Sequence, residues 1–487
     1  MDNGIILTGM IIYFLSILLM GLYFSRVEMN REKYMLGEGK IPGWVLAFSE
    51  RATGSSAWLL LGFTGFTFAT GLSAVWMAVG SALGAIIAWV WLAKKFMVRA
   101  KENNTLTLPA FIAEMFDHNR RMILLSSTIV IVLFFIFYLG AQIAGAGKTL
   151  HETFGWNPIL TMLICTIVMM VLTFWGGFTS VVWTDMVQGV LMLATLTIIP
   201  GIALYQVYTQ DLSISETLAN SGAGMNSWTG GLTGLALGVL FFNNFSYFFG
   251  YFGGQPQLST RFMALKNDRE LKTGTWTVIF WSTVSFTGAF LVGLTGLTLY
   301  GPNVVDDVEM ILPFMVLDLT PAWLAGILLS GIIAAIITTG NSQLMVVVSS
   351  INEDLIRETF GIKLSDEVLL RYSKITVVLA SLLGFVMAIA TESLVLLIVS
   401  WAWGGVGNTF SVVILLAFFW RKYSSIGALA TIISGLVSTI IWISTPLDEI
   451  ITSRFSTFVI ALIFGVVFSL LFPDKKKDKE VAEAAVE

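Results

Sequence analysis

The sequence predicts an all-α integral membrane protein, and two observations support that prediction. Of the 487 residues, 56% are hydrophobic and only 12% are charged, whereas soluble domains average about 25% charged residues. The apolar residues also form runs of about 20, the length of a membrane-crossing helix, and not the alternating runs of about 10 found in membrane barrels. This composition excludes a soluble enzyme, a disordered chain and a nucleic-acid-binding protein.

Thirteen apolar stretches are long enough to cross a membrane, so we expect thirteen transmembrane helices. They cover approximately residues 4–24, 43–70, 74–96, 122–147, 158–178, 181–207, 230–253, 274–300, 320–350, 371–390, 393–419, 424–445 and 453–472. No change of composition divides them. Residues 1–473 are therefore expected to form one transmembrane domain, and the charged residues 474–487 a disordered tail.

The lysine and arginine residues predict the orientation of the chain. All but three of the 27 lie in the tail or in loops that follow odd-numbered stretches, and the exceptions are Arg51, Lys148 and Arg454. Because basic loops remain in the cytoplasm, we expect an outside N-terminus and a cytoplasmic C-terminus. The predicted location is the cell membrane, with the chain crossing it many times.

The second stretch breaks the rules for a lipid-embedded helix. It contains Ser49-Glu50-Arg51-Ala52-Thr53-Gly54-Ser55-Ser56 directly before Ala57 and Trp58. A glycine among hydroxyl residues favours a break in the helix, and the carbonyl groups that a break frees are suitable ligands for Na⁺. The charges of Glu50 and Arg51 are costly at membrane depth. They form either a mutual or snorkelling ion pair near the inner interface or part of a functional site.

The seventh stretch contains a second break, in Gly250-Tyr251-Phe252-Gly253-Gly254-Gln255-Pro256. Interrupted hydrophobic segments at matching positions indicate a transporter with inverted repeats. The two breaks lie five stretches apart, and this odd offset gives the halves opposite orientations. We therefore expect repeats at residues 43–207 and 230–419, with stretches 1, 12 and 13 peripheral.

Three further segments allow two interpretations each. Residues 334–342, which contain Thr338 and Thr339, favour either close helix packing or a polar site. Asp185 is either a carboxylate in the first turn of a helix or a coupling residue inside the membrane. Residues 401–408 have three glycines in four positions, which indicates either a flexible gate or a crowded packing seam.

Several motifs, in their order and spacing, resemble those of the sodium:solute symporter family, and bacterial sodium/proline symporters in particular. The resemblance extends from about Tyr34 to Trp420. Its motifs are Tyr34-Met35-Leu36-Gly37, Ser56-Ala57-Trp58-Leu59-Leu60, Asn104-Thr105-Leu106-Thr107-Leu108-Pro109, Trp175-Gly176-Gly177 with Trp183-Thr184-Asp185, the Gly250 to Pro256 segment with Arg261-Phe262-Met263-Ala264, Ala325-Gly326-Ile327-Leu328-Leu329-Ser330, and Asn352-Glu353-Asp354-Leu355.

The resemblance implies a leucine-transporter-type fold with a 5+5 inverted repeat. It also implies a symporter that imports a small solute, such as proline or a related amino acid or carboxylate, together with Na⁺. The implied sodium ligands are the carbonyls of Ala52, Ser55 and Ala335 and the hydroxyls of Thr338 and Thr339. The implied substrate residues are Ser56, Trp58, Tyr138, Tyr247 and Tyr251.

One departure from the family pattern leaves the coupling ion open. Sodium/proline symporters resemble this chain but carry an aspartate at the position of Gly54, and they lack Glu50 and Arg51. Glu50 either replaces that carboxylate or accepts a proton, so H⁺ is the alternative coupling ion. Arg51 either serves as a tethered cation, which would allow transport without an ion gradient, or anchors a substrate carboxylate.

Functions of other classes are less well supported. A membrane-embedded solute sensor of the same fold remains an alternative, and uptake of labelled solute by the isolated protein would distinguish it. An enzyme is not expected, because the two histidines, His118 and His151, lie in or near loops without metal-ligand spacing. The expected partners are a small-molecule substrate and the lipid bilayer, with no nucleic acid, and the oligomeric state is left open.

Overall fold

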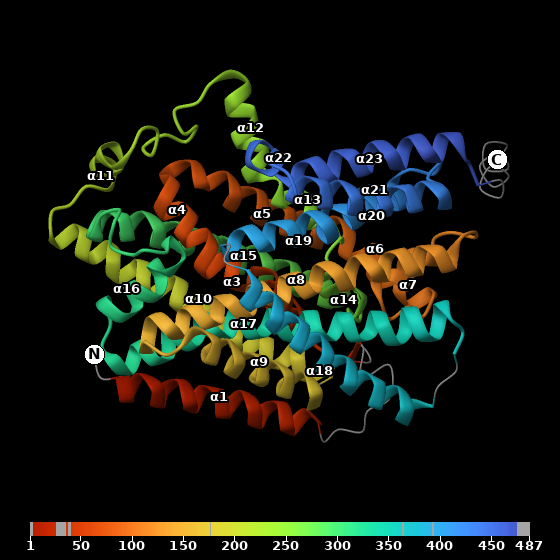
Figure 1. Ribbon diagram of the computed structural model, residues 1–487, viewed down its shortest axis with the longest axis horizontal. Coiled ribbons are helices and arrows are strands. Elements are labelled where there is room, and N and C mark those ends of the chain that lie inside the picture. The colour runs from red at the N-terminus through yellow and green to blue at the C-terminus, as the bar shows by residue number, and fades with distance from the viewer. Residues whose placement is uncertain are drawn as a thin grey trace.

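The computed structural model describes residues 3–25, 36–37, 40–175, 177–362, 365–391 and 394–474. Every regular element in these ranges is a helix, and Figure 1 shows most of the long helices running side by side along the longest axis. Tyr34, Met35 and Gly176 of the family motifs lie outside the described residues, as do residues 475–487 of the expected tail.

The first half of the chain carries the predicted first repeat. Its helices are α1 (Asn3–Ser25), α3 (Gly43–Ala57), η2 (Trp58–Phe63), α4 (Thr64–Thr70), η3 (Gly71–Ala74), α5 (Val75–Ile87), η4 (Ala88–Leu92), α6 (Ala93–Glu102), α7 (Leu108–Ala113), α8 (Arg120–Phe154), α9 (Pro158–Trp175), α10 (Phe178–Thr209) and α11 (Ile214–Ser221). The Thr107 side chain caps α7 by accepting the N–H of Ala110.

The second half carries the predicted second repeat and two further long helices. Its helices are α12 (Gly234–Phe245), α13 (Tyr247–Gly250), α14 (Pro256–Met263), α15 (Asp268–Tyr300), η5 (Val308–Met310), α16 (Ile311–Leu319), α17 (Ala322–Ser349), η6 (Ser350–Thr359), α18 (Asp366–Ala390), α19 (Val395–Ala402), η7 (Trp403–Asn408), α20 (Thr409–Phe419), α21 (Ser425–Ile443), α22 (Leu447–Ile450) and α23 (Ser453–Leu471).

Ten helical segments in the described residues are long and apolar enough to cross a membrane. One of them, Gly43–Glu102, reverses direction at Gly71 between α4 and α5 (Figure 1). Two shorter apolar helices cover Pro158–Phe174 and Gly234–Gly250. The helical membrane class is confirmed, and the count of thirteen spans stays a prediction.

The first predicted break is present at the end of α3. Ser56 has φ 49° and ψ −167° inside an otherwise helical segment, and the chain continues as η2, a wide π-helical turn. Two side chains replace the missing helix bonds. Gln142 of α8 accepts the N–H of Ala57 at 3.0 Å, and the Ser56 hydroxyl accepts the N–H of Trp58 at 3.2 Å.

The second predicted break separates α13 from α14. Residues 251–255 are not helical, Gly253 has a φ of 79°, and α14 starts at Pro256, where a proline is tolerated. Gly254 lies directly against the backbone of Gly407 and Ser411, so a Cβ atom at this position would collide with both. The glycines therefore allow the broken segment to pack against η7.

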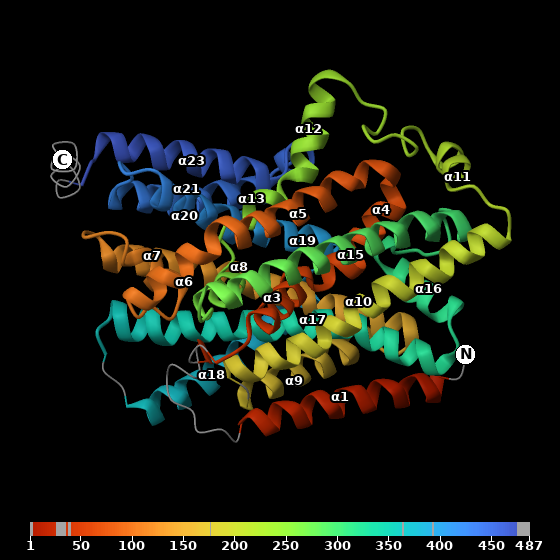
Figure 2. The same cartoon turned by 180° about the vertical axis from the view of Figure 1, so that it is seen from behind.

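Helix α17 lies inside the bundle, in contact with α1, α3, α8 and α10, and Figure 2 shows it between α10 and α18. Gly9 of α1 faces Gly326 of α17, where a Cβ on Gly326 would reach the Ile6 carbonyl oxygen at 2.8 Å. This is the close packing that small residues permit between membrane helices.

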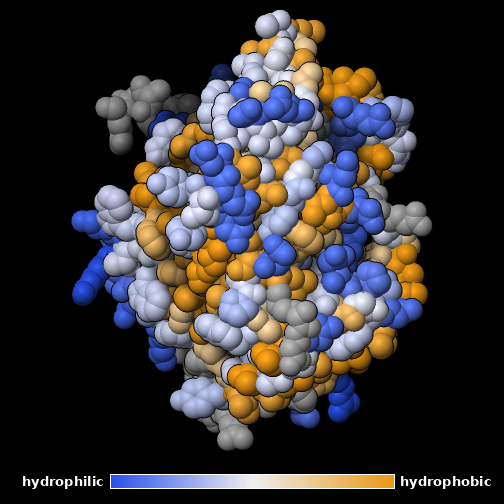
Figure 3. Space-filling view, turned by 90° about the vertical axis from the view of Figure 1, so that its left-hand side faces the viewer, coloured by the Kyte–Doolittle hydropathy of each residue, from blue (hydrophilic) through white to orange (hydrophobic). Residues whose placement is uncertain are grey.

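The outer surface of the bundle fits a lipid environment on its sides. Large apolar side chains are exposed along α1, α18 and α23, with Leu19 at 66%, Val386 at 57% and Ile463 at 53% exposure. Figure 3 views the end that carries α11 and α16, where hydrophilic residues mix with hydrophobic ones. Apolar sides with more polar ends are expected of a protein that spans a membrane.

Candidate ion and solute site

Four of the five predicted sodium ligands meet where α3 contacts α17. The Thr338 hydroxyl lies 3.4 Å from the carbonyl oxygen of Ala52 and 3.0 Å from that of Ala335. The Thr339 hydroxyl lies 2.8 Å from the carbonyl oxygen of Thr53 and 3.0 Å from that of Ala335. Both threonines are fully buried. The contact gathers neutral oxygens from two helices, a donor set that suits a hard monovalent cation.

The fifth predicted ligand, Ser55, is placed differently. Its carbonyl accepts the N–H of Trp58 at the end of α3, while its buried hydroxyl has no hydrogen-bond partner. Thr53 contributes an additional oxygen that sequence reasoning missed. Among the described residues no group of three His, Cys, Asp or Glu side chains could hold a metal ion, so the neutral oxygens are the fitting set.

Asp185 lies beside this contact and is fully buried. It is the eighth residue of α10, beyond the first turn. Its carboxylate accepts from the Ser49 hydroxyl at 2.8 Å, the Thr53 hydroxyl at 3.1 Å and Arg261 at 3.1 Å. Sequence reasoning missed Arg261 as a site residue and counted it as a loop charge, although it lies in the half-helix α14, after the predicted break.

Arg261 also joins α14 to α17, because its guanidinium donates to the Ser342 hydroxyl at 2.8 Å. The Asp185–Arg261 pair therefore connects four elements: α3 through Ser49, α10, α14 and α17. The pair lies next to the contact of Thr338 and Thr339 with α3, since Thr53 joins both groups.

Glu50 and Arg51 form a mutual pair in the interior of the protein. Arg51 donates through Nε to Glu50 at 2.6 Å and through Nη2 to the other carboxylate oxygen. Trp89 donates to Glu50 at 3.1 Å. The two side chains are 0% and 1% exposed, so the pair is not a snorkelling surface pair. A Cβ on Gly54 would lie 3.3 Å from Arg51 Nη2, so the small residue at position 54 leaves room for the guanidinium.

Four aromatic side chains among the five predicted substrate residues form one cluster at the two breaks, and Ser56, the fifth, lies at its edge. Trp58 stacks on Tyr247 with ring centroids 4.8 Å apart and 6° between planes. The Tyr138 hydroxyl lies 3.2 Å from the Ser56 hydroxyl, and Arg51 lies over the Tyr251 ring at 4.9 Å.

Trp403 of η7 completes the cluster, and sequence reasoning did not assign it to the site. Its indole N–H donates to the Tyr138 hydroxyl at 3.3 Å, and its ring contacts those of Tyr247 and Tyr251. Three glycines in residues 404–407 allow η7, a fully buried π-helical turn, to pack closely against its neighbours. The signal was present in the sequence as a glycine-rich segment beside two tryptophans.

A charged clamp joins loop segments at the predicted outer end of the bundle. Glu309 of η5 accepts the N–H groups of Val395 and Leu396, each at 2.9 Å, and lies 3.4 Å from Lys148. Lys148 also pairs with Asp307 at 2.8 Å. Burial raises the pKa of the Glu309 carboxyl, against the opposing effect of these hydrogen bonds. The clamp fixes the first turn of α19 to η5 and α8.

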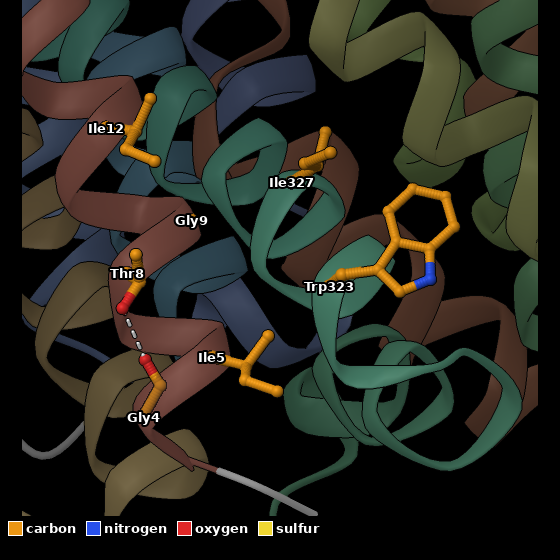
Figure 4. Close-up of a pocket in the computed structure, with 7 residues that line it drawn as sticks. All are labelled: Gly4, Ile5, Thr8, Gly9, Ile12, Trp323 and Ile327. Carbon is orange, nitrogen blue, oxygen red and sulfur yellow. Dashed lines mark hydrogen bonds between the residues drawn. The ribbon is translucent and has the colours of Figure 1, made fainter.

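A separate groove lies between α1 and α17 (Figure 4). Its volume is about 640 Å³, and it is lined by Gly4, Ile5, Thr8, Gly9, Ile12, Trp323 and Ile327. None of these residues belongs to the ion contact or to the aromatic cluster. The groove is almost entirely apolar, so it is not a second polar site.

Two interrupted helices, neutral oxygens between α3 and α17, and an aromatic cluster at both breaks define the class of membrane transporter with discontinuous helices. The sequence profile described as the sodium:solute symporter family matches residues 34–435. The chain belongs to the sodium:solute symporter family, as the resemblance of its motifs predicted.

Characterised relatives match along nearly the whole chain. The osmoregulated proline transporter OpuE of Bacillus subtilis is 31% identical over 466 residues, covering 94% of this chain and 93% of that protein. The high-affinity proline transporter PutP of Bacillus subtilis is 32% identical, with coverage of 93% and 95%. The sodium/proline symporter of Escherichia coli is 32% identical, with coverage of 97% and 95%.

Solved structures share the fold at lower identity. A Na⁺-coupled sialic acid symporter in a substrate-bound outward-open state superposes with a TM-score of 0.80 at 20% identity, covering 97% of this chain and all of that one. MhsT in complex with L-phenylalanine gives a TM-score of 0.56 at 14% identity, with coverage of 88% and 97%. The leucine-transporter-type fold is thus confirmed.

Proposed function

We propose that this protein imports proline, or a closely related amino acid or carboxylate, together with Na⁺ by alternating access. The observation that carries the proposal is the contact of Thr338 and Thr339 with the carbonyls of α3, next to the break at Ser56. Relatives that cover nearly the whole chain are named proline transporters or sodium/proline symporters. The aromatic cluster suits a small solute with an apolar body.

The ion contact provides a physical route to coupling. Na⁺ between α3 and α17 would hold the two helices together, so it would favour the conformation in which both sides of its site are assembled. A solute that binds the same conformation at the Ser56 break then binds more tightly when Na⁺ is present. The coupling is a difference in affinity between conformations.

The proposed architecture has thirteen spans, with repeats at residues 43–207 and 230–419, an outside N-terminus and a cytoplasmic C-terminus. The two breaks and the placement of basic residues support it. Asp185, held by Arg261 beside the ion contact, is proposed as a coupling residue.

Uptake of labelled L-proline into proteoliposomes tests the proposed function. An inward Na⁺ gradient should drive uphill accumulation, and an ionophore that collapses the gradient should abolish it. Accumulation that follows an imposed H⁺ gradient and ignores Na⁺ would instead support proton coupling. No uptake with either gradient, in protein that still binds proline, would favour a solute sensor.

The buried carboxylate of Glu50 is the observation that favours proton coupling. Its two oxygens already accept bonds from Arg51 and Trp89, however, whereas the neutral oxygens of the α3–α17 contact match a Na⁺ site. The proposal therefore assigns the coupling ion to Na⁺.

A further inference from the structure

Three arginines are buried in the described part of the chain, and they differ in how their charges are balanced. Arg51 is paired with Glu50 and Arg261 with Asp185. Arg454, in the first turn of α23, is 4% exposed, yet no carboxylate oxygen of the described residues lies within 4.0 Å of it. Arg454 is therefore the buried arginine whose charge lacks a partner within the part of the fold that is described.

The guanidinium of Arg454 is held firmly by neutral groups. Its Nε donates to the Ser246 hydroxyl at 3.0 Å, its Nη1 to the Ser400 hydroxyl, and its Nη2 to the Asn243 carbonyl oxygen at 2.9 Å. A guanidinium has five N–H donors, so these three bonds leave two donors for another ligand. The carboxylate of Asp448 accepts the N–H groups of Ser453 and Trp401, and it does not lie within 4.0 Å of the Arg454 guanidinium.

The position of Arg454 connects it to the solute site. Its guanidinium lies over the ring of Tyr247 at 4.0 Å, and Tyr247 stacks on Trp58 at the break of α3. Helix α23 belongs to a stretch expected to be peripheral, yet it packs against η7, where Asn408 donates to the Arg454 carbonyl oxygen.

An unbalanced buried charge is costly, and an ionisable residue within a membrane segment is by default a functional candidate. A guanidinium that is already oriented, with donors free, is a good receptor for a carboxylate because it can bind both oxygens. A solute that supplies this anion would balance the charge only when it is bound, so its carboxylate would contribute strongly to affinity.

We propose that Arg454 binds the carboxylate of the transported solute, while the aromatic cluster around Tyr247 and Trp403 receives its apolar body. This inference rests on the proposed function, and it specifies the solute class as a small monocarboxylate, including zwitterionic amino acids. It assigns the anchor to Arg454 and not to Arg51, whose charge Glu50 already balances through two hydrogen bonds.

The test compares L-proline with L-prolinamide, which lacks the carboxylate. Wild-type protein in NaCl should bind proline about 10- to 100-fold more tightly than prolinamide, as expected for a charge-assisted contact. Binding is measured by thermal shift on the purified full-length protein, and competition by inhibition of labelled proline uptake into proteoliposomes. Arg454→Gln should reduce the preference for proline over prolinamide to less than about threefold, mainly because it binds proline more weakly.

A second variant separates anchoring from a merely structural role. Ser400→Asp places a carboxylate next to Arg454 Nη1, so it should balance the buried charge from within. We expect this variant to keep or raise the melting temperature while it loses affinity for proline. The matched control is Arg99→Gln, since Arg99 also lies over an aromatic ring, Phe418 at 5.0 Å, but away from the site.

Each outcome is decisive. Loss of the proline preference in Arg454→Gln and Ser400→Asp, with Arg99→Gln unchanged, supports the inference. If Arg454→Gln does not fold, Ser400→Asp decides alone, and unaltered proline affinity in that variant overturns the inference. If Glu50→Gln/Arg51→Gln loses the preference for proline over prolinamide while Ser400→Asp keeps its proline affinity, the anchor is Arg51 and the inference is overturned. If the wild-type protein takes up no solute, both the proposed function and the inference fail. If the wild-type protein takes up proline but Arg454→Gln keeps the full preference for proline over prolinamide, the inference alone is overturned.

Discussion

Thr339 is the side chain through which the ion contact can be tested most directly. Its hydroxyl joins the Thr53 and Ala335 carbonyls, so Thr339→Ala should remove one oxygen without changing the aromatic cluster. The loss of one neutral ligand, at about 1 kcal/mol, predicts a rise of about fivefold in the half-saturating Na⁺ concentration for proline uptake. Thr339→Ser keeps the hydroxyl and is the control. An unchanged Na⁺ dependence in Thr339→Ala would remove this residue from the ligand set.

Glu50 and Arg51 test how a charge pair is tolerated inside the bundle. Glu50→Gln leaves the Arg51 guanidinium buried and unbalanced, so the variant should be less stable by about 3–5 kcal/mol. Removing both charges in Glu50→Gln/Arg51→Gln should recover much of that loss. The melting temperature of purified protein measures both effects, with Glu449→Gln on the exposed helix α22 as the matched control. Equal stabilities of the single and double variants would contradict the prediction.

At the scale of single residues, the sequence predicted which residues lie together better than it predicted how they are bonded. Ala52, Ala335, Thr338 and Thr339 converge as the family resemblance implied, and the five predicted substrate residues do too. Their roles as ligands stay predictions. Trp403 and Arg261 were missed although a glycine-rich segment and a predicted break mark their surroundings, because neither pattern shows which distant side chains they contact. Arg454 lies in an apolar helix in which no local pattern indicates its contacts.

The broken segment between α13 and α14 depends on a glycine at position 254. Gly254→Ala would push a methyl group into the Gly407 and Ser411 backbone of η7 and α20. Overpacking of this kind costs about 1–3 kcal/mol, so we expect a lower melting temperature and a strong loss of uptake. Gly201→Ala on α10 is the control, because a Cβ there meets nothing within 4 Å. If Gly254→Ala matched that control, close packing at the second break would not be needed.

The clamp on η5 predicts a pH dependence of stability. The raised pKa of the Glu309 carboxyl means that the folded protein binds its proton more tightly than the unfolded chain does. The protonated Glu309 carboxyl therefore stabilises the folded state fully at pH values below its ordinary pKa of 4.5. This stabilisation is lost as the pH rises through the raised pKa of the folded protein. Melting temperatures of wild type and Glu309→Gln, measured across this pH window, should differ in slope. Parallel curves would contradict the prediction.

Both helix breaks could be predicted because glycine, proline and hydroxyl residues have local effects on the backbone. The break at Ser56 and the turn before Pro256 lie inside the predicted segments. Residues 401–408 were interpreted as either a flexible gate or a crowded packing seam. All six residues of the π-helical turn at 403–408 are buried, which fits a packing seam and leaves the gate a prediction. The insertion of α23 beside η7 could not be predicted, because an apolar helix does not show in its sequence which neighbour it will contact.

The orientation of the whole chain is testable with single cysteines. Cys165 is buried, and Cys165→Ser supplies the background. Ala219→Cys, exposed in α11, should react with a membrane-impermeant thiol reagent in intact cells. Arg269→Cys, exposed at the start of α15, should react only after the cells are opened. Labelling of Arg269→Cys in intact cells would reverse the proposed topology.

For the whole molecule, composition and the length of the apolar runs were enough to identify a helical membrane protein. A chain with 12% charged residues cannot cover a soluble fold of this size, and runs of about 20 residues fit helices. The number of spans is harder to predict. Residues 158–174 and 234–250 form apolar helices that are shorter than the ten long segments. Length thresholds therefore treat them differently, although both lie within stretches that were predicted to span the membrane, 158–178 and 230–253.

Helix α17 has a mechanical consequence for transport. It continues without a gap into η6, and Asp354 of η6 accepts a hydrogen bond from Thr107 at 2.5 Å. Asp354 lies 15 residues beyond Thr339, about 22 Å along the rod at an α-helical rise. If α17 and η6 move as one body, a change in the spacing of α3 and α17 shifts the anchorage of the α6–α7 loop, so binding of the proposed ion would also act at the far end of α17.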